Sequence, residues 1–145
     1  MYDCIIVGTG PAGLSAALNM KMFRKDYIWF GTKSLSSKVT KAEKIANYPG
    51  VPMVSGADLN KKFREQADEM GLEPVNKRVT NIADMGGSFM ILADNEMFEA
   101  RAVLLSTGIA AAKGMENEAR LLGSGVSYCA TCDGFLYKGK TAAVY

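Results

Sequence analysis

Two cysteines near the end of the chain, Cys129 and Cys132, are the residues whose spacing most directly predicts chemistry. Two intervening residues allow a reversible disulfide between them, and the thiolate form of either cysteine is a nucleophile. Asp133 follows the second cysteine directly, and the chain contains no histidine. We therefore expect Asp133 to give a proton to a leaving thiolate or to take one from a thiol.

Other uses of this cysteine pair fit the sequence less well. A zinc site needs a second Cys or His pair, and the only other cysteine is Cys4, inside an apolar segment. A permanent disulfide is rare in the cytoplasm, and an odd number of cysteines suits a secreted disulfide framework poorly. We expect a redox pair, no metal site, and a Cys4 that is a small buried core residue.

A second candidate site is the glycine-rich segment Gly8-Thr9-Gly10-Pro11-Ala12-Gly13. It fits the G-x-G-x-x-G pattern and lies between an apolar strand and a helix, which is the context that a dinucleotide-binding turn requires. The first glycine makes the tight turn, the second lets the backbone approach a pyrophosphate, and the third allows close packing of helix and strand. The following helix would present free N–H groups to the phosphates.

The acidic residue that usually binds the ribose is missing. It should follow the second strand, about twenty residues after the turn, where this chain has Phe30-Gly31-Thr32-Lys33. We expect the backbone, Thr32 or Lys33 to hold the ribose instead. Because a lysine also suits a 2′-phosphate, the turn by itself leaves FAD, NAD and NADP open.

The elements that position these residues begin with one βαβ unit. Apolar runs predict strands over residues 2–7 and 26–30, and an Ala- and Leu-rich stretch predicts a helix over 14–24. Residues 32–52 read as a loop. A second helix is expected over 57–70, with Ser55 as its cap, Asp58 in a capping-box variant and Gly71 as its stop.

Short strands dominate the rest of the chain. We expect them over residues 72–75, 78–84, 88–93 and 97–100, the last three forming a β-meander, with a separate apolar strand over 102–105. Residues 109–118 are typical of a linker, and residues 140–145 resemble the first strand of another domain.

Composition excludes several classes of protein. With 145 residues, a net charge of +2 and 48% hydrophobic residues, the chain is typical of a globular protein. Its basic residues are scattered apart from a loose cluster in 33–44, so nucleic acid is not an expected partner. No apolar run approaches the roughly 18 residues that a membrane span requires. The N-terminus lacks the features of a secretory signal, and we expect a cytoplasmic protein.

The sequence resembles the low-molecular-weight thioredoxin reductases along essentially its whole length. The resemblance depends on the glycine turn, on Asn47-Tyr48-Pro49-Gly50, on Ser106-Thr107-Gly108 and on Gly125-Val126-Ser127-Tyr128-Cys129-Ala130-Thr131-Cys132-Asp133-Gly134-Phe135. It implies an α/β fold: a Rossmann-like FAD-binding domain with a parallel sheet, helices and a β-meander. Residues 1–112 would form the first segment of that domain. Residues 113–145 would hold a linker and the start of a second dinucleotide-binding domain.

The resemblance also implies roles for particular residues. Cys132 would face the flavin, and Cys129 would attack the disulfide of a thioredoxin-like partner. The positions that match FAD contacts in the family are Gly10, Pro11, Ala12, Asn47, Thr107 and Gly108. Members of the family are usually homodimers.

One segment departs from the family pattern. Ser36-Ser37-Lys38-Val39 stands where the family typically has Gly-Gly-Gln-Leu beside the flavin, so Lys38 and Val39 are candidate cofactor contacts. Divergent clostridial-type members are similar here and are thought to use ferredoxin. The expected electron donor is therefore NADPH or ferredoxin.

We do not expect the C-terminal half of such an enzyme within these 145 residues. We expect an inactive fragment whose parent reduces a protein disulfide, without a complete FAD pocket or any NADPH site of its own. The alternative class is a non-catalytic nucleotide-binding or interaction module. A simple NAD-dependent dehydrogenase would leave the cysteine pair unexplained.

Overall fold

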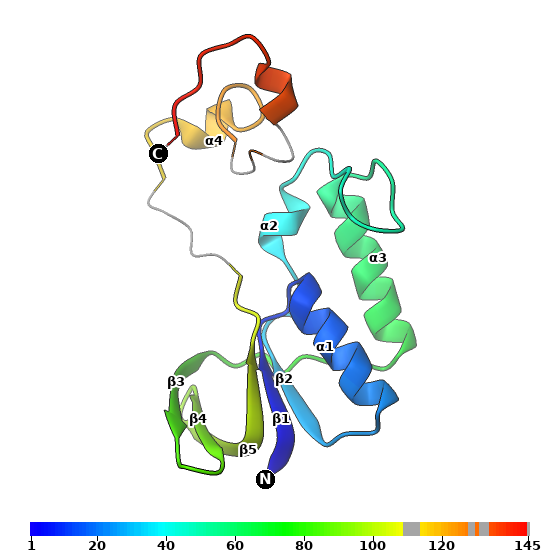
Figure 1. Cartoon of the computed structure of the whole chain (residues 1–145), viewed down its shortest axis with the longest axis vertical. Coiled ribbons are helices and arrows are strands. Elements are labelled where there is room, and N and C mark those ends of the chain that lie inside the picture. Colours follow the sequence, from blue (N-terminus) through cyan, green and yellow to red (C-terminus); the bar gives the residue numbers. More distant parts are fainter. Residues whose placement is uncertain (109–113, 128–129, 131–133, 145) are drawn as a thin grey trace.

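The computed structural model describes residues 1–108, 114–127, 130 and 134–144 (Figure 1). Its centre is a sheet with the strand order β2-β1-β5-β4-β3. The strands are β1 (Tyr2–Val7), β2 (Tyr27–Phe30), β3 (Val79–Asp84), β4 (Phe89–Ala93) and β5 (Glu96–Leu105). Strand β1 is parallel to both of its neighbours, and Ile5 pairs with Ile28 of β2 and with Val103 of β5. The sheet therefore has a parallel half and an antiparallel half, as the α/β fold class predicts.

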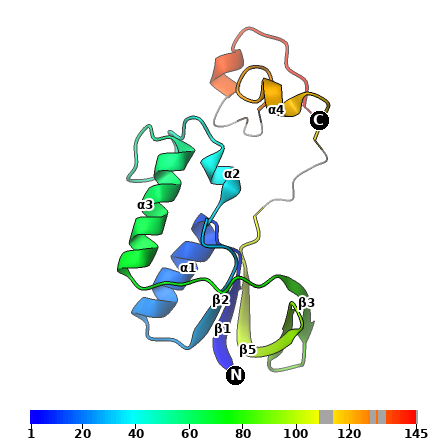
Figure 2. The ribbon, with the colours of Figure 1, turned by 180° about the vertical axis from the view of Figure 1, so that it is seen from behind.

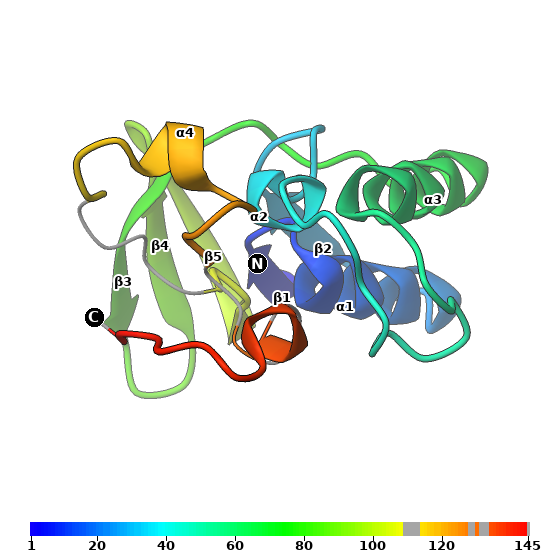
Figure 3. The same cartoon turned by 90° about the horizontal axis from the view of Figure 1, so that it is seen from above.

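Two of the helices, over residues 11–22 and 56–69, cover one face of the parallel strands, and the antiparallel strands cover the other. The helices are α1 (Pro11–Met22), α2 (Ser37–Thr40), α3 (Gly56–Glu69), α4 (Glu118–Leu121) and the 3-10 turn η1 (Gly134–Tyr137). Viewed from above, α1 and α3 lie on one side of β1 and β2, and β3 and β4 lie on the other (Figure 3). The view from behind shows the same three layers (Figure 2).

Strand β1 is apolar on both faces because it separates two cores. Cys4 and Ile6 face the helices, in a cluster that includes Trp29, Leu59 and Phe63. Ile5 faces the antiparallel layer, where it packs with Phe30, Ile91, Ala93 and Ala100. The sequence of a strand that is buried on both faces is a continuous apolar run rather than an alternation of apolar and polar residues. This explains the pattern at residues 2–7.

Helix α3 begins and ends where its sequence signals predict. The Ser55 hydroxyl accepts a hydrogen bond from the Asp58 backbone N–H at 3.1 Å and donates one to the Asp58 carboxylate at 2.6 Å. Gly71 terminates the helix with a positive φ of 61°. The buried residues Leu59, Phe63 and Ala67 recur every four positions and give the helix one apolar face.

Strand β5 corrects one prediction, because residues 97–100 and 102–105 belong to a single strand. Its first half pairs with β4 in antiparallel fashion, and its second half pairs with β1 in parallel fashion. Ala100 is the joint: it pairs with both Phe89 and Tyr2 and is fully buried. The small side chain lets the strand pass between the two layers without a break.

Three shorter segments and the start of α1 also differ from expectation. Residues 72–75 form only an isolated bridge between Val75 and Phe30, since Pro74 has no N–H to donate. The expected loop over residues 32–52 contains α2 and half of a bridge between Ile45 and Val54. Residues 141–144 form no strand. Helix α1 starts at Pro11, three residues before the predicted start.

Within the described ranges, no helix is long and apolar enough to cross a membrane.

Gly56, the first residue of α3, packs against α2 with no space for a side chain. A Cβ at this position would lie 1.7 Å from the Val39 carbonyl oxygen. We expect Gly56→Ala to lower the free energy of unfolding by about 3 kcal/mol, since the helices must separate. Gly87→Ala is the matched control, because a Cβ there has nothing within 4 Å. Urea denaturation of both variants measures the difference, and equal midpoints would contradict this explanation.

Candidate nucleotide-binding site

The glycine turn lies where three parallel strands end together. Strands β1, β2 and β5 end at Val7, Phe30 and Leu105, and these residues pair side by side in the register of the sheet. The loops that follow, residues 8–10, 31–36 and 106–108, therefore lie at one edge. In open α/β sheets this carboxyl edge is where ligands bind.

The first and third glycines of the turn are enclosed by backbone. Gly8 has a φ of 110°, and a Cβ on it would lie 2.3 Å from the Ser106 carbonyl oxygen. A Cβ on Gly13 would lie 1.9 Å from the Gly8 carbonyl oxygen. Both positions therefore exclude any side chain for reasons of packing.

The second glycine is different, because its backbone faces open space. A Cβ on Gly10 would have nothing within 4 Å. Gly10 is also the N-cap of α1, where it makes no side-chain cap, and the first turn of that helix carries no acidic residue. The early N–H groups of a helix lack intrahelical partners and carry partial positive charge. This open end of α1 suits a phosphate group.

Two side chains hold the turn in place through the Gly8 carbonyl oxygen. The Trp29 indole N–H donates to it at 2.8 Å. The Ser106 hydroxyl lies 3.2 Å from the same oxygen and 2.9 Å from the Val7 carbonyl oxygen. Sequence reasoning missed both residues, since a tryptophan within a strand reads only as core. The position of Ser106 directly before Thr107-Gly108 was the one available signal.

The loop after β2 contains Gly31, Thr32 and Lys33. Gly31 has a φ of 150°, and a Cβ on it would lie 2.4 Å from the Thr9 methyl carbon. The Thr32 hydroxyl lies 3.0 Å from the Ser34 hydroxyl. The Lys33 ammonium forms an ion pair with Glu73 at 2.7 Å. The side chains of Thr32 and Lys33, which were predicted to contact the ribose, are both exposed. The charge of Lys33 is already paired with that of Glu73.

The remaining predicted cofactor contacts divide into exposed and inward-facing residues. Lys38 is exposed on α2, whereas Val39 packs against the helix-side core. Figure 1 places α2 beyond the carboxyl ends of the parallel strands. Thr107 and Gly108 are exposed directly after β5, and Asn47 is exposed beside Tyr48, which packs edge-on against Phe63. Val39 thus helps to hold α2 against that core, and its contact with a cofactor stays a prediction.

Cys129, Cys132 and Asp133 lie outside the described residues, as does the expected domain boundary at residue 112. Their roles stay predictions. Cys4 is described, and burial raises the pKa of its thiol. A buried, protonated thiol is a poor nucleophile, which agrees with the expectation of a core residue.

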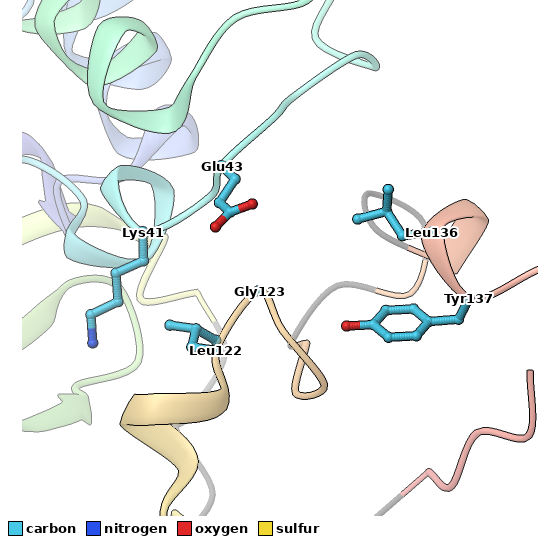
Figure 4. A pocket seen from close by; sticks show the side chains of 6 residues that line it. All are labelled: Lys41, Glu43, Leu122, Gly123, Leu136 and Tyr137. Carbon is cyan, nitrogen blue, oxygen red and sulfur yellow. The ribbon is translucent and has the colours of Figure 1, made fainter.

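The C-terminal segment contacts the N-terminal part of the chain at a small cavity of about 100 Å³ (Figure 4). Gly123 has a φ of 78°, and a Cβ on it would lie 2.5 Å from the Glu43 carboxylate. The cavity is lined by Lys41, Glu43, Leu122, Gly123, Leu136 and Tyr137. Its volume suits a few water molecules rather than a nucleotide.

Known proteins resemble this chain in both sequence and fold. Thioredoxin reductase from Helicobacter pylori is 40% identical over 148 residues, which cover 99% of this chain and 48% of the relative. The ferredoxin-flavin thioredoxin reductase from Clostridium acetobutylicum is 46% identical with a TM-score of 0.73, covering 94% of this chain and 48% of that one. Thioredoxin reductase from Streptococcus pyogenes is 31% identical with a TM-score of 0.81, covering 94% of this chain and 45% of that one.

These matches confirm the resemblance to thioredoxin reductases and the Rossmann-like fold. The chain spans about half the length of the relatives that it matches. The family model for pyridine nucleotide-disulphide oxidoreductases matches residues 2–145. Since that match covers nearly all of its length, the chain belongs to the pyridine nucleotide-disulphide oxidoreductase family.

Proposed function

We propose that this chain is the nucleotide-binding half of a flavin-dependent enzyme that reduces the disulfide of a thioredoxin-like protein. One observation carries the proposal: the open N-terminus of α1 lies at the shared carboxyl edge of three parallel strands. Named thioredoxin reductases that are 31–46% identical support the same chemistry. The complete activity belongs to a protein of the length of those relatives.

The residues at the open edge fit the ADP half of FAD. The backbone of Gly10 and Ala12 would approach the pyrophosphate, since neither the helix end nor its first turn carries a competing acid. Thr107 and Gly108 would border the ligand from the end of β5, and Asn47 and Lys38 from the segment above the sheet. Bound FAD would supply a pair of electrons to the Cys129–Cys132 disulfide.

The two cysteines would then exchange electrons with the partner. The Cys129 thiolate attacks one sulfur of the partner disulfide, which forms a mixed disulfide and releases a partner thiolate. Cys132 next attacks the Cys129 sulfur, which frees the second partner thiolate and restores the Cys129–Cys132 disulfide. Asp133 passes protons to the leaving thiolates. The partner gains two electrons and two protons, and the cysteine pair loses the same number.

The electron donor to the flavin is NADPH or ferredoxin. The name of the Clostridium acetobutylicum protein includes ferredoxin, and that protein is 46% identical to this chain. This similarity supports ferredoxin as the donor. We also propose that the full-length protein forms a homodimer and is located in the cytoplasm.

The charge at the start of α1 gives a direct test of nucleotide binding. Ala12→Asp places a carboxylate beside the proposed pyrophosphate, and we expect it to weaken FAD or ADP binding by about tenfold through charge repulsion. Ala57→Asp is the matched control, because Ala57 is also exposed and second in its helix. Neither change should destabilise the fold, since acids suit the first turn of a helix.

Trp29 provides the signal for this titration. It is the only tryptophan of the chain, and its indole contacts the glycine turn at 2.8 Å. Bound FAD should quench its fluorescence. If the wild-type protein shows no quenching at millimolar ligand, the interaction module is favoured. If Ala12→Asp binds the ligand as tightly as the wild type, the phosphate does not bind at the start of α1.

The cysteine pair is tested in the full-length protein. We expect Cys129→Ser and Cys132→Ser each to reduce disulfide-reductase activity by at least about 100-fold, since serine cannot form the disulfide. Cys4→Ala should keep most of the activity, because Cys4 is buried among core residues. Reduction of thioredoxin, followed by appearance of free thiols, measures all three. Full activity in either serine variant would contradict the proposal.

The electron donor is distinguished with the same full-length protein. Under anaerobic conditions, we expect reduced ferredoxin to bleach the flavin absorbance and NADPH to leave it unchanged. Rapid bleaching of the flavin absorbance by NADPH alone would identify NADPH as the donor instead.

A further inference from the structure

In the described part of the chain, Lys33 in the loop after β2 and the neighbouring Arg64 are each paired with a carboxylate. We propose that Thr9 and Gly31 together exclude the usual ribose-binding acid, so that this site binds an adenine nucleotide about equally well with a 2′-hydroxyl or a 2′-phosphate. The inference rests on the proposed nucleotide binding and adds the specificity of that site.

Gly31 occupies the position where the acid is expected, directly after β2. Its φ of 150° disfavours every side chain, and the space of a Cβ is already filled. The Thr9 methyl carbon would lie 2.4 Å from that Cβ and the Thr9 hydroxyl oxygen 2.9 Å from it. An Asp or Glu at position 31 is therefore excluded twice, by backbone conformation and by contact.

Thr9 cannot easily turn away to make room. It is 6% exposed, the one buried polar residue in the described part of the chain. Its hydroxyl donates to the Leu35 carbonyl oxygen at 3.0 Å. A rotated Thr9 would leave the hydroxyl without this partner in a buried environment, which is costly.

The charged groups near this loop are paired. Lys33 pairs with Glu73 at 2.7 Å. Arg64 donates to the Lys33 carbonyl oxygen at 3.4 Å, and its guanidinium also pairs with Asp68. The hydrogen bond that Arg64 donates to Asp68 lowers the pKa of the Asp68 carboxyl, so the pair stays charged at neutral pH.

A ribose bound at this loop would therefore meet hydroxyl groups and charged side chains that are already paired with each other. The hydroxyls of Thr32 and Ser34, 3.0 Å apart and exposed, can bond to a 2′-hydroxyl or to a phosphate oxygen. Without an acid, a 2′-phosphate meets no repulsion. With Lys33 paired to Glu73, it also gains little attraction.

Displacement of bound FAD by ADP-ribose and by 2′-phospho-ADP-ribose tests this specificity, with the recovery of Trp29 fluorescence as the signal. We expect the wild-type chain to bind the two ligands with affinities within about threefold of each other. Glu73→Gln releases Lys33 and should shift the preference toward the 2′-phosphate by about fivefold at low salt, with the shift decreasing as salt is added. The double variant Lys33→Gln/Glu73→Gln should return to wild-type behaviour.

Each contrary outcome has a distinct meaning. A wild-type preference above about tenfold for either ligand, or no shift in Glu73→Gln, overturns this inference and leaves nucleotide binding intact. Failure of the wild-type chain to bind either ligand overturns both the inference and the proposed function. Lys33 and Glu73 are exposed, so folding of the variants is readily checked by their urea midpoints.

The packing of Thr9 against Gly31 is tested separately by stability. Gly31→Ala should lower the urea midpoint, and it should do so less in a Thr9→Gly background, where the contacting side chain is gone. Equal losses in both backgrounds would show that Thr9 does not limit position 31.

Discussion

The Gly8 carbonyl oxygen is the point on which the candidate site depends. It receives the Trp29 indole N–H from β2, and the Ser106 hydroxyl lies within hydrogen-bonding distance from the loop after β5. The third glycine of the turn packs against the same atom. A peptide group fixed from two neighbouring strands has little freedom to rotate, so the turn and the start of α1 keep one orientation. Such preorganisation lowers the cost of binding a ligand.

The layers around this point explain why so many small residues are needed. Gly8, Gly13 and Gly56 each lie where a Cβ would contact a carbonyl oxygen, and Ala100 lets β5 pass from one layer to the other. Close backbone contacts of this kind hold the carboxyl edge together alongside the hydrogen bonds of Trp29 and Ser106. The exposed backbone at Gly10 is thereby left available at that edge.

Local signals in the sequence predicted most of the helix and strand positions. The βαβ unit follows from apolar runs and the glycine turn, and the ends of α3 follow from Ser55 and Gly71. The single strand β5 could not be predicted, because its two halves take different partners far away in the sequence. The contacts of Trp29, Ser106 and Thr9 likewise arise only from tertiary packing. Cys129, Cys132 and Asp133 lie outside the described residues, so their assignment rests on sequence alone.

The bond from Ser106 to Val7 joins residues that are 99 positions apart. Contacts across such a distance require closure of a long loop, which slows folding. On the ribosome, βαβ pairing of β1 with β2 can begin early, but the support from β5 must wait until residue 106 has left the exit tunnel. The carboxyl edge with its glycine turn is therefore among the last parts of this domain to become rigid during synthesis. A nascent chain would pass through a stage in which the glycine turn exists without one of its two anchors.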